Sequence, residues 1–337
     1  VAMGTLSLSA DTTGNKSTAI GYGALNLQNV TNGADMFNTA VGFAAGAAVT
    51  TGTRDTLIGG LAGDALTTGS FNVAVGYTSL GATTTGASNV ALGDASLSSN
   101  TTGSTNTAVG QAALSSNTTA SNNTAVGKSA LTANTTGDLN TAVGSLALDA
   151  NTTGANNTAL GHESLGVNTT GNSNTAIGED SLQANTTASN NVAVGRRAMF
   201  ANTTGTDNVA LGHNALDANT TADNNTAVGK AALTANTTGA SNTATGAGAS
   251  ISNTVGSGNV AIGLNALYAN TGSSLNVAVG VGALDAFNVG SGNGYNTAVG
   301  DQAGGSVTTG IQNTFVGGLA GDATDDGANN TAVGYGS

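Results

Sequence analysis

Residues 106–122 read NTAVGQAALSSNTTASN, and residues 123–139 repeat the same pattern as NTAVGKSALTANTTGDL. We number the positions of this repeat from 1 to 17, starting at its first asparagine. Every step between repeats is 17 residues except two: Ser17 to Asn38 is 21 and Asn276 to Asn296 is 20. Residues 1–4 are the same motif without its asparagine, which makes 20 repeats in all. The other repeats start at Ser17, Asn38, Asp55, Asn72, Asn89, Asn106, Asn123, Asn140, Asn157, Asn174, Asn191, Asn208, Asn225, Asn242, Asn259, Asn276, Asn296, Asn313 and Asn330.

The repeat constrains some positions strongly and leaves others free. Position 3 is nearly always alanine, position 4 is Val, Ile or Leu, and position 5 is glycine. Position 9 is leucine in most repeats, and position 12 opens an Asn-Thr-Thr run in nine successive repeats, from Asn100 to Asn236. Position 6 varies freely. Low complexity is also a signature of disorder. In a disordered chain, however, position 9 would not need to be leucine in most repeats while position 6 varies.

The period and the residue types together predict the fold class. Paired-helix repeats are roughly 33 to 47 residues long, and fixed Gly, Asn and Thr are poor helix formers. Short β-branched segments between Gly and Asn are typical of strands and tight turns. We therefore predict an all-β chain, a parallel β-solenoid (β-roll) of about 20 coils with strands at positions 2–4 and 8–11. Residues 1–337 would form one continuous repeat region, with insertions near residues 26–37 and 286–295.

Equivalent positions stack on one another in such a solenoid. Asparagines at positions 1 and 12 are then expected to form amide ladders, and glycine at position 5 to supply a turn with positive φ. The aliphatic residues at positions 4 and 9 are expected to fill a thin core as two columns. The core residues predicted from this pattern are Val109, Leu114, Val126, Leu131, Val143, Leu148, Leu160 and Leu165.

The free position 6 predicts a solvated ridge along the solenoid. Four aromatic residues of this ridge are candidates for ligand contact, because exposed rings stack on sugars; isolated exposed side chains are the simpler interpretation. A cluster of four charges at positions 6 and 7 of adjacent repeats should place opposite signs side by side, each contact contributing about 0–1 kcal/mol. The candidate ligand-contact residues are Tyr22, Phe43, Tyr77 and Tyr335, and the charge cluster is Glu179, Asp180, Arg196 and Arg197.

The thin core predicts association with other chains. With about two large apolar side chains per coil, a solenoid on its own would be marginally stable. Position 2 alternates between Thr and Val, and position 3 is alanine on the opposite face of the same strand. Both faces of that strand are therefore apolar or small, as expected if one packs inside the coil and the other against a second chain.

Composition excludes several classes of protein. The chain has 6 Lys+Arg against 18 Asp+Glu, a net charge of −12, which argues against nucleic-acid binding. No stretch approaches the roughly 18 consecutive apolar residues of a membrane span. No signal-peptide pattern is present, so we expect such a segment to be absent or removed. The lack of cysteine excludes disulfides and thiolate metal sites.

Catalytic and metal-binding residues are sparse. His162 and His213 both occupy position 6 three repeats apart, about 14 Å by strand spacing, which is too far for a shared metal ion. Asp149, Asp217 and Asp285 occupy position 10 of separated repeats and form no close pair. The acidic spot at 322–327 lacks the Gly-x-Asp pattern of calcium-binding β-rolls. We expect no enzyme activity, no metal site and no cofactor. The Asn-Thr-Thr runs match the glycosylation pattern but are explained by turns and ladders.

The motif NTAVG followed by AL and NTTG resembles two families. It is similar to the head repeats of trimeric autotransporter adhesins, and it looks even more like the repeats of tail-fibre-domain proteins of phages and bacteria. The resemblance covers the whole chain and implies a left-handed β-roll assembled as an intertwined homotrimer. The repeat here has 17 residues rather than the roughly 14 of the adhesin heads, and residues 1–337 contain neither a coiled-coil stalk nor a membrane anchor.

These patterns lead to two functional hypotheses. The leading one is a non-enzymatic structural and attachment segment of an extracellular fibre, on a virion tail or a bacterial surface, that contacts a cell-surface glycan or protein receptor. Because the chain begins and ends inside a repeat without a cap, we expect it to be a fragment of a longer fibre. The alternative is an ice-binding β-solenoid using threonine columns. It is disfavoured because adjacent threonines at positions 13 and 14 should point to opposite sides.

Overall fold

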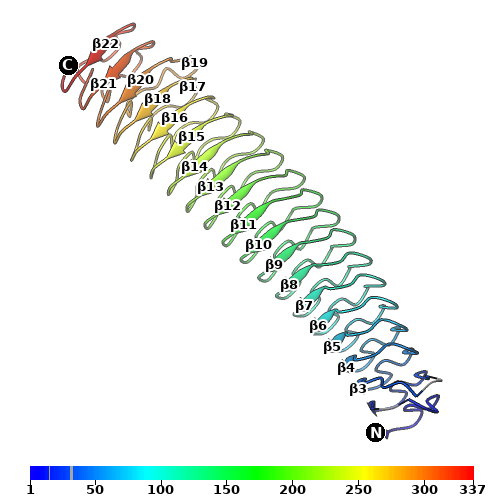
Figure 1. The fold of residues 1–337 in the computed structure, drawn as a ribbon. Coiled ribbons are helices and arrows are strands. Elements are labelled where there is room, and N and C mark those ends of the chain that lie inside the picture. Colours follow the sequence, from blue (N-terminus) through cyan, green and yellow to red (C-terminus); the bar gives the residue numbers. More distant parts are fainter. Residues whose placement is uncertain (15, 31–32) are drawn as a thin grey trace. The chain divides into compact units, whose positions relative to one another are not determined.

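The computed structural model describes residues 1–14, 16–30 and 33–337, which form two compact units, Val1–Thr170 and Gly171–Ser337. Each unit is a parallel β-solenoid, and the described residues contain strands and turns but no helix (Figure 1). The predicted all-β solenoid fold is therefore confirmed. The insertion expected near residues 26–37 falls partly on residues 31–32, which lie outside the described part of the chain.

The first unit contains one short strand per repeat. Each strand covers positions 2–4, except the first, which is one residue shorter. The strands are β1 Ala2–Met3, β2 Thr18–Ile20, β3 Thr39–Val41, β4 Thr56–Ile58, β5 Val73–Val75, β6 Val90–Leu92, β7 Thr107–Val109, β8 Thr124–Val126, β9 Thr141–Val143 and β10 Thr158–Leu160.

The second unit follows the same plan, with two extra strands that pair with each other at the second insertion. These are β17 Ser273–Ser274 and β19 Gly292–Asn293. The repeat strands are β11 Thr175–Ile177, β12 Val192–Val194, β13 Val209–Leu211, β14 Thr226–Val228, β15 Thr243–Thr245, β16 Val260–Ile262, β18 Val277–Val279, β20 Thr297–Val299, β21 Thr314–Val316 and β22 Thr331–Val333.

Within each unit, successive strands pair in parallel and in register. Strand β7 pairs with β8 so that Thr107 faces Thr124 and Ala108 faces Ala125, a shift of one repeat. The same register holds in the second unit, where Ala193 of β12 faces Ala210 of β13. Each repeat is thus one coil, and equivalent positions form columns along each unit, as predicted.

The second predicted strand, at positions 8–11, is wrong. The described residues form overlapping turns there, with Ala113 N–H donating to Gly110 O at 3.3 Å and Asn117 N–H to Leu114 O at 3.1 Å. Ala112 at position 7 and Leu114 at position 9 have φ of 57° and 52°. Extended strands require negative φ, so this segment cannot be a strand. Positive φ at the third residue of a turn is typical of type II turns, which usually place glycine there.

The turn segment is tied to both neighbouring coils. Ala112 N–H donates to Asp94 O of the preceding coil at 2.9 Å, and Leu114 N–H donates to Ala130 O of the following coil at 3.0 Å. A non-glycine residue with positive φ carries a cost of about 1–3 kcal/mol. Repeated inter-coil hydrogen bonds hold the leucine in this conformation, and its side chain is directed into the core.

The glycine at position 5 ends each strand in a conformation that excludes other residues. Gly110, Gly127 and Gly144 have φ of 134°, 139° and 138°. A Cβ on Gly127 would lie 2.4 Å from the carbonyl oxygen of Gly144 in the next coil. Position 5 therefore needs glycine for both its dihedral angle and its contact with the next coil, which confirms the positive-φ turn predicted at this position.

The core is built differently from the sequence prediction. The predicted leucine column at position 9 is confirmed, because Leu114, Leu131, Leu148 and Leu165 are fully buried. The predicted column at position 4 is wrong: Val109, Val126 and Val143 are half-buried, and Leu160 is 46% exposed. Alternate residues of a strand point to opposite sides. The fully buried alanine at position 3 points inward and leaves room for the leucine from the opposite wall, so position 4 points outward.

In two coils the large side chain lies at position 3 and glycine lies at position 9, the reverse of the usual arrangement. Position 3 is Leu57 in one coil and Phe315 in another, and both side chains are fully buried. Position 9 is glycine in each of these coils and in the coil before. A Cβ on Gly46 or Gly63 would lie 2.6 Å or 2.9 Å from a methyl carbon of Leu57. The large residue at position 3 thus occupies the volume that leucine fills elsewhere.

The asparagines at positions 1 and 12 form the two predicted amide ladders. Asn123 Oδ1 accepts the backbone N–H of Asn140 at 2.8 Å, and Asn123 Nδ2 donates to Gly137 O at 2.9 Å. In the second ladder, Asn134 Nδ2 donates to Asn117 Oδ1 at 3.1 Å. These side chains are fully buried. A buried amide is costly unless its groups are hydrogen-bonded, and here each rung satisfies the next.

We predict that Gly127→Ala breaks the solenoid locally, because its methyl group would meet the Gly144 carbonyl. The substitution should lower the free energy of unfolding by about 3 kcal/mol, measured by chemical denaturation. Lys128→Ala, at the exposed neighbouring position, is the control and should change it by less than about 0.5 kcal/mol. Equal stability of the two variants would contradict the glycine column.

We also predict that Leu57→Ala costs about 3 kcal/mol, because the two facing glycines cannot fill the cavity. Adding Gly46→Leu and Gly63→Leu restores the regular pattern of small position 3 and large position 9. The triple variant should recover most of the lost stability in the same unfolding assay. A triple variant less stable than Leu57→Ala would contradict the claim that Leu57 fills the space occupied by the position-9 leucine in other coils.

Candidate functional site

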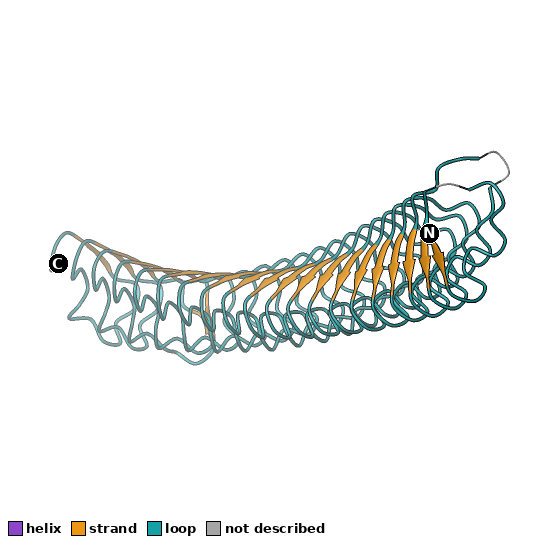
Figure 2. Cartoon of the chain, turned by 90° about the horizontal axis from the view of Figure 1, so that it is seen from below, coloured by secondary structure: helices purple, strands orange, loops and turns teal. Residues whose placement is uncertain are grey.

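The outward side of the strands carries a row of partly exposed apolar side chains in each unit. We use the name sheet face for the side chains at positions 2 and 4 of the repeat strands. The strands themselves lie along one side of the coils in each unit (Figure 2). Position 2 is Thr or Val, and position 4 is Val, Ile or Leu in all but a few coils. Leu160 in the first unit and Leu211 in the second are both 46% exposed, and Ile262 is 40% exposed. Because these residues are stacked rather than scattered, position 4 forms an apolar stripe along each unit, which Thr245 interrupts in the second unit.

The ridge at position 6 follows directly after the sheet face. Of its candidate ligand-contact residues, Tyr22 and Phe43 stack with their ring centroids 5.6 Å apart and their planes 10° from parallel. Tyr77 lies over Gly60, whose added Cβ would be 3.4 Å from the tyrosine ring. In the second unit Tyr335 is similarly placed against Gly318 and is 83% exposed. In the first unit, Tyr22 and Phe43 therefore form a stacked pair, and Tyr77 lies two coils beyond Phe43, over Gly60.

A second aromatic column was missed by the sequence analysis. It lies at position 17, the residue before each repeat, where Lys16 lies 5.1 Å from the ring centroid of Phe37 and Arg54 lies 5.2 Å from that of Phe71. The alternation of cation and ring every repeat was the available signal, but position 17 holds no constant residue type elsewhere. Aromatic residues thus precede and follow the sheet face in these coils. We use the name aromatic patch for two groups of rings on either side of the sheet face, Tyr22, Phe43 and Tyr77 at position 6 and Phe37 and Phe71 at position 17.

The predicted charge cluster is only partly formed. Arg196 pairs with Glu179 of the preceding coil at 3.2 Å, as expected from their shared position. Arg197 instead reaches Asp217 of the following coil at 3.3 Å, and its guanidinium lies 4.0 Å from the ring centroid of Phe200. The expected pairing of Arg197 with Asp180 is therefore wrong. The Arg197 side chain thus reaches position 10 of the following coil and not position 7 of the preceding one.

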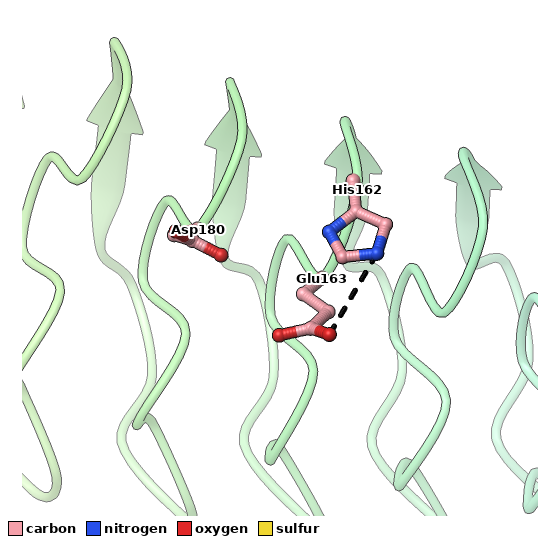
Figure 3. Close-up of side chains that lie close together, drawn as sticks. All are labelled: His162, Glu163 and Asp180. Atoms are coloured by element: carbon pink, nitrogen blue, oxygen red, sulfur yellow. Dashed lines mark ion pairs between the residues drawn. The ribbon is translucent and has the colours of Figure 1, made fainter.

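The two histidines lie in different units. His162 is exposed, and its Nε2 lies 3.7 Å from a carboxylate oxygen of Glu163 (Figure 3). His213 occupies the same ridge position in the second unit. A contact of this length between partly exposed side chains contributes little to stability.

An acidic hollow of about 200 Å³ lies in the second unit, lined by Asp285, Gln302, Gly305, Ser306 and Asp322. Burial raises the pKa of Asp285, and the charge of Asp322 adds to the effect. Asp322 accepts a hydrogen bond from the Ser306 hydroxyl at 3.1 Å. Glycine at position 10 makes this space, because Asp285 leans toward Gly305 of the next coil.

Position 10 repeats this arrangement twice in the first unit. Asp64 leans toward Gly81 and Asp149 toward Gly166, each with a carboxylate oxygen 3.5 Å from where a glycine Cβ would lie. Burial raises the pKa of both carboxyls, and for Asp149 the charge of Glu163 adds a smaller contribution. These aspartates are single partly buried acids in separated coils.

The threonine columns use their hydroxyls unequally. At position 13, Thr118 Oγ1 donates to the Thr135 carbonyl of the next coil at 3.0 Å, and Thr135 repeats this contact with Thr152. These threonines are half-buried, whereas those at position 14 are exposed. One exposed column therefore remains, as the alternation argument predicted. The asparagine of each Asn-Thr-Thr run is buried in the second ladder.

No protein-family model matches the chain, and a search of curated proteins finds no match. Among the described residues, no helix has the length and apolar character needed to cross a membrane. We take the sheet face and the aromatic patch as the candidate functional site.

Proposed function

We propose that this chain is a non-enzymatic structural and attachment segment of an extracellular fibre, a phage tail fibre or a bacterial surface adhesin, assembled as a homotrimer. The observation that carries this proposal is the sheet face. Monomeric proteins rarely expose a contiguous apolar stripe, and a large one marks an interaction site. The stripe repeats along the coils, so a partner with the same repeat spacing would match it. A second copy of this chain has that spacing.

The core supports the same assembly. Inside most coils, alanine at position 3 leaves leucine at position 9 as the main large apolar side chain, with buried asparagines on either side. Packing the sheet faces of three chains together would give each strand a second apolar environment. The resemblance of the NTAVG repeats to trimeric adhesin heads and tail-fibre repeats leads to the same stoichiometry.

The aromatic patch and the position-6 ridge supply the attachment surface of the proposal. Exposed tyrosine rings offer both an apolar face and a hydroxyl, which suits contact with a cell-surface glycan or protein. We favour this role over ice binding because the position-13 hydroxyls already bond to the next coil. A flat array of paired threonine columns is therefore not formed.

The assembly is tested by measuring mass in solution by light scattering, where we expect three chains. Val126→Asp combined with Val143→Asp places two charges on the sheet face and should dissociate the trimer while leaving the strand signal in circular dichroism unchanged. Thr136→Asp with Thr153→Asp, on the exposed position-14 column, is the matched control and should remain trimeric. A monomeric parent chain, or identical masses for both variants, would contradict the proposal.

Attachment is tested by binding of the labelled chain to candidate host cells, with glycan arrays to identify a sugar ligand. Replacing Tyr22, Phe43 and Tyr77 by serine should reduce binding at least tenfold, because each ring contributes contact area at the ridge. The matched control replaces Asp94, Gln111 and Lys128 by serine at the same position of later coils. An equal loss in both variants would place the receptor contact elsewhere.

A further inference from the structure

The position-1 ladder contains one residue that does not fit its chemistry. From Asn38 to Asn330 every rung is asparagine except Asp55. In a regular rung, Asn72 Oδ1 accepts the backbone N–H of Asn89 at 3.0 Å, and Asn72 Nδ2 donates to Gly86 O at 3.1 Å. Each rung thus needs one acceptor toward the next rung and one donor toward the position-15 carbonyl of its own coil.

Asp55 fulfils the acceptor half of this pattern. It is fully buried, and its backbone N–H donates to Asn38 Oδ1 at 2.9 Å. Its Oδ1 accepts the backbone N–H of Asn72 at 2.8 Å and the Asn72 side-chain amide at 3.2 Å. Asp55 Oδ1 therefore stands in the place of an asparagine Oδ1.

Asp55 can donate a hydrogen bond to the position-15 carbonyl only if its carboxyl group carries a proton. Asp55 Oδ2 is buried without a hydrogen-bond partner, and the position-15 carbonyl of its coil belongs to Gly69. Both atoms border Gly52, since a Cβ there would lie 2.3 Å from Gly69 O and 3.2 Å from Asp55 Oδ2. Where position 12 is asparagine it also donates to this carbonyl, as Asn100 does to Gly103, but here position 12 is Leu66.

Among the residues that the structure describes, no charged group compensates an ionised Asp55. The rungs on either side are Asn38 and Asn72, and position 12 is Val49 in the preceding coil and Leu66 in its own. The neighbouring Arg54 is directed to the ring of Phe71, 5.2 Å from its centroid. A buried carboxylate with no cation and an acceptor beside it is strongly disfavoured.

We propose that Asp55 is a neutral carboxylic acid in the folded solenoid, that its Oδ2–H takes the place of the asparagine donor toward the Gly69 carbonyl, and that loss of this proton opens the ladder between Asn38 and Asn72. The proton comes from solvent and returns to it, so the rung is a reversible pH-sensitive joint in the first unit.

The direction of the pH dependence follows from burial. Burial raises the pKa of Asp55 to about 7 from 3.8, and the hydrogen bonds from Asn72 offset only part of this. A pKa that is higher in the folded state gives full stability below the unfolded value, and that stability is lost as pH rises through the folded value. The joint is therefore closed in mildly acidic solution and loosens above neutrality.

Hydrogen–deuterium exchange of residues 38–72, corrected for the intrinsic effect of pH, tests the joint. Between about pH 5.5 and pH 8.5 protection in the parent chain should fall about thirtyfold. Asp55→Asn restores the regular rung, so its protection should stay constant and exceed that of the parent at the higher pH. The carbonyl stretch of a neutral carboxylic acid should appear in the infrared spectrum at the lower pH and disappear in Asp55→Asn.

Two further variants make the test specific. Asp64→Asn removes a partly buried acid of the same coil that lies outside the ladder, and it should leave the pH dependence of residues 38–72 unchanged. Asn296→Asp transplants the acid to a rung whose coil also has an apolar residue at position 12, the buried Val307, and it should create the same pH dependence there. Parallel profiles for the parent and Asp55→Asn, or no neutral-acid band at the lower pH, would overturn the proposal.

Discussion

The in-register stacking of glycine at position 5 is the constraint on which each unit depends. A Cβ on one such glycine would meet the carbonyl oxygen of the glycine in the following coil, at 2.4 Å for Gly127 and Gly144. No other residue fits both this approach and a φ near 135°. Once these glycines are aligned, positions 2–4 pair as parallel strands, and every other position falls into a column whose neighbours are copies of itself. The ladders, the core and the sheet face all follow from that alignment.

Much of this was predictable from the sequence, since a period of 17 residues can be counted. The strand at positions 2–4, the glycine turn, the leucine column and both asparagine ladders were identified correctly. The segment at positions 8–11 was not, because leucine at position 9 gives no sign of the left-handed backbone that Leu114 adopts. The outward direction of Val109 and Val126 was missed for a related reason: size suggested a core residue, but the space inside is taken by leucine from the opposite wall.

Some contacts of the candidate site could be predicted from the sequence and others could not. Stacking placed Tyr22 beside Phe43 and Arg196 beside Glu179, as their shared position required. The partners of Arg197 and the column of Phe37 and Phe71 depend on backbone turns at positions 7 and 17 that no residue type marks. The result is a chain whose interior is specified by repetition. A few residues differ from the repeat pattern and distinguish individual coils: Leu57, Phe315, Asp55 and the aromatic patch.

The most direct test of one coil per repeat is a set of spin-label distances in the first unit, measured on chains diluted with unlabelled protein. One label replaces Phe43, and the second replaces Asp94, Lys128 or His162, which lie three, five and seven repeats further along at the same position. Strand spacing of about 4.8 Å predicts narrow distributions that grow linearly, by about 10 Å for each two repeats. Broad distributions, or distances that do not rise in proportion to the number of repeats, would contradict the stacked solenoid.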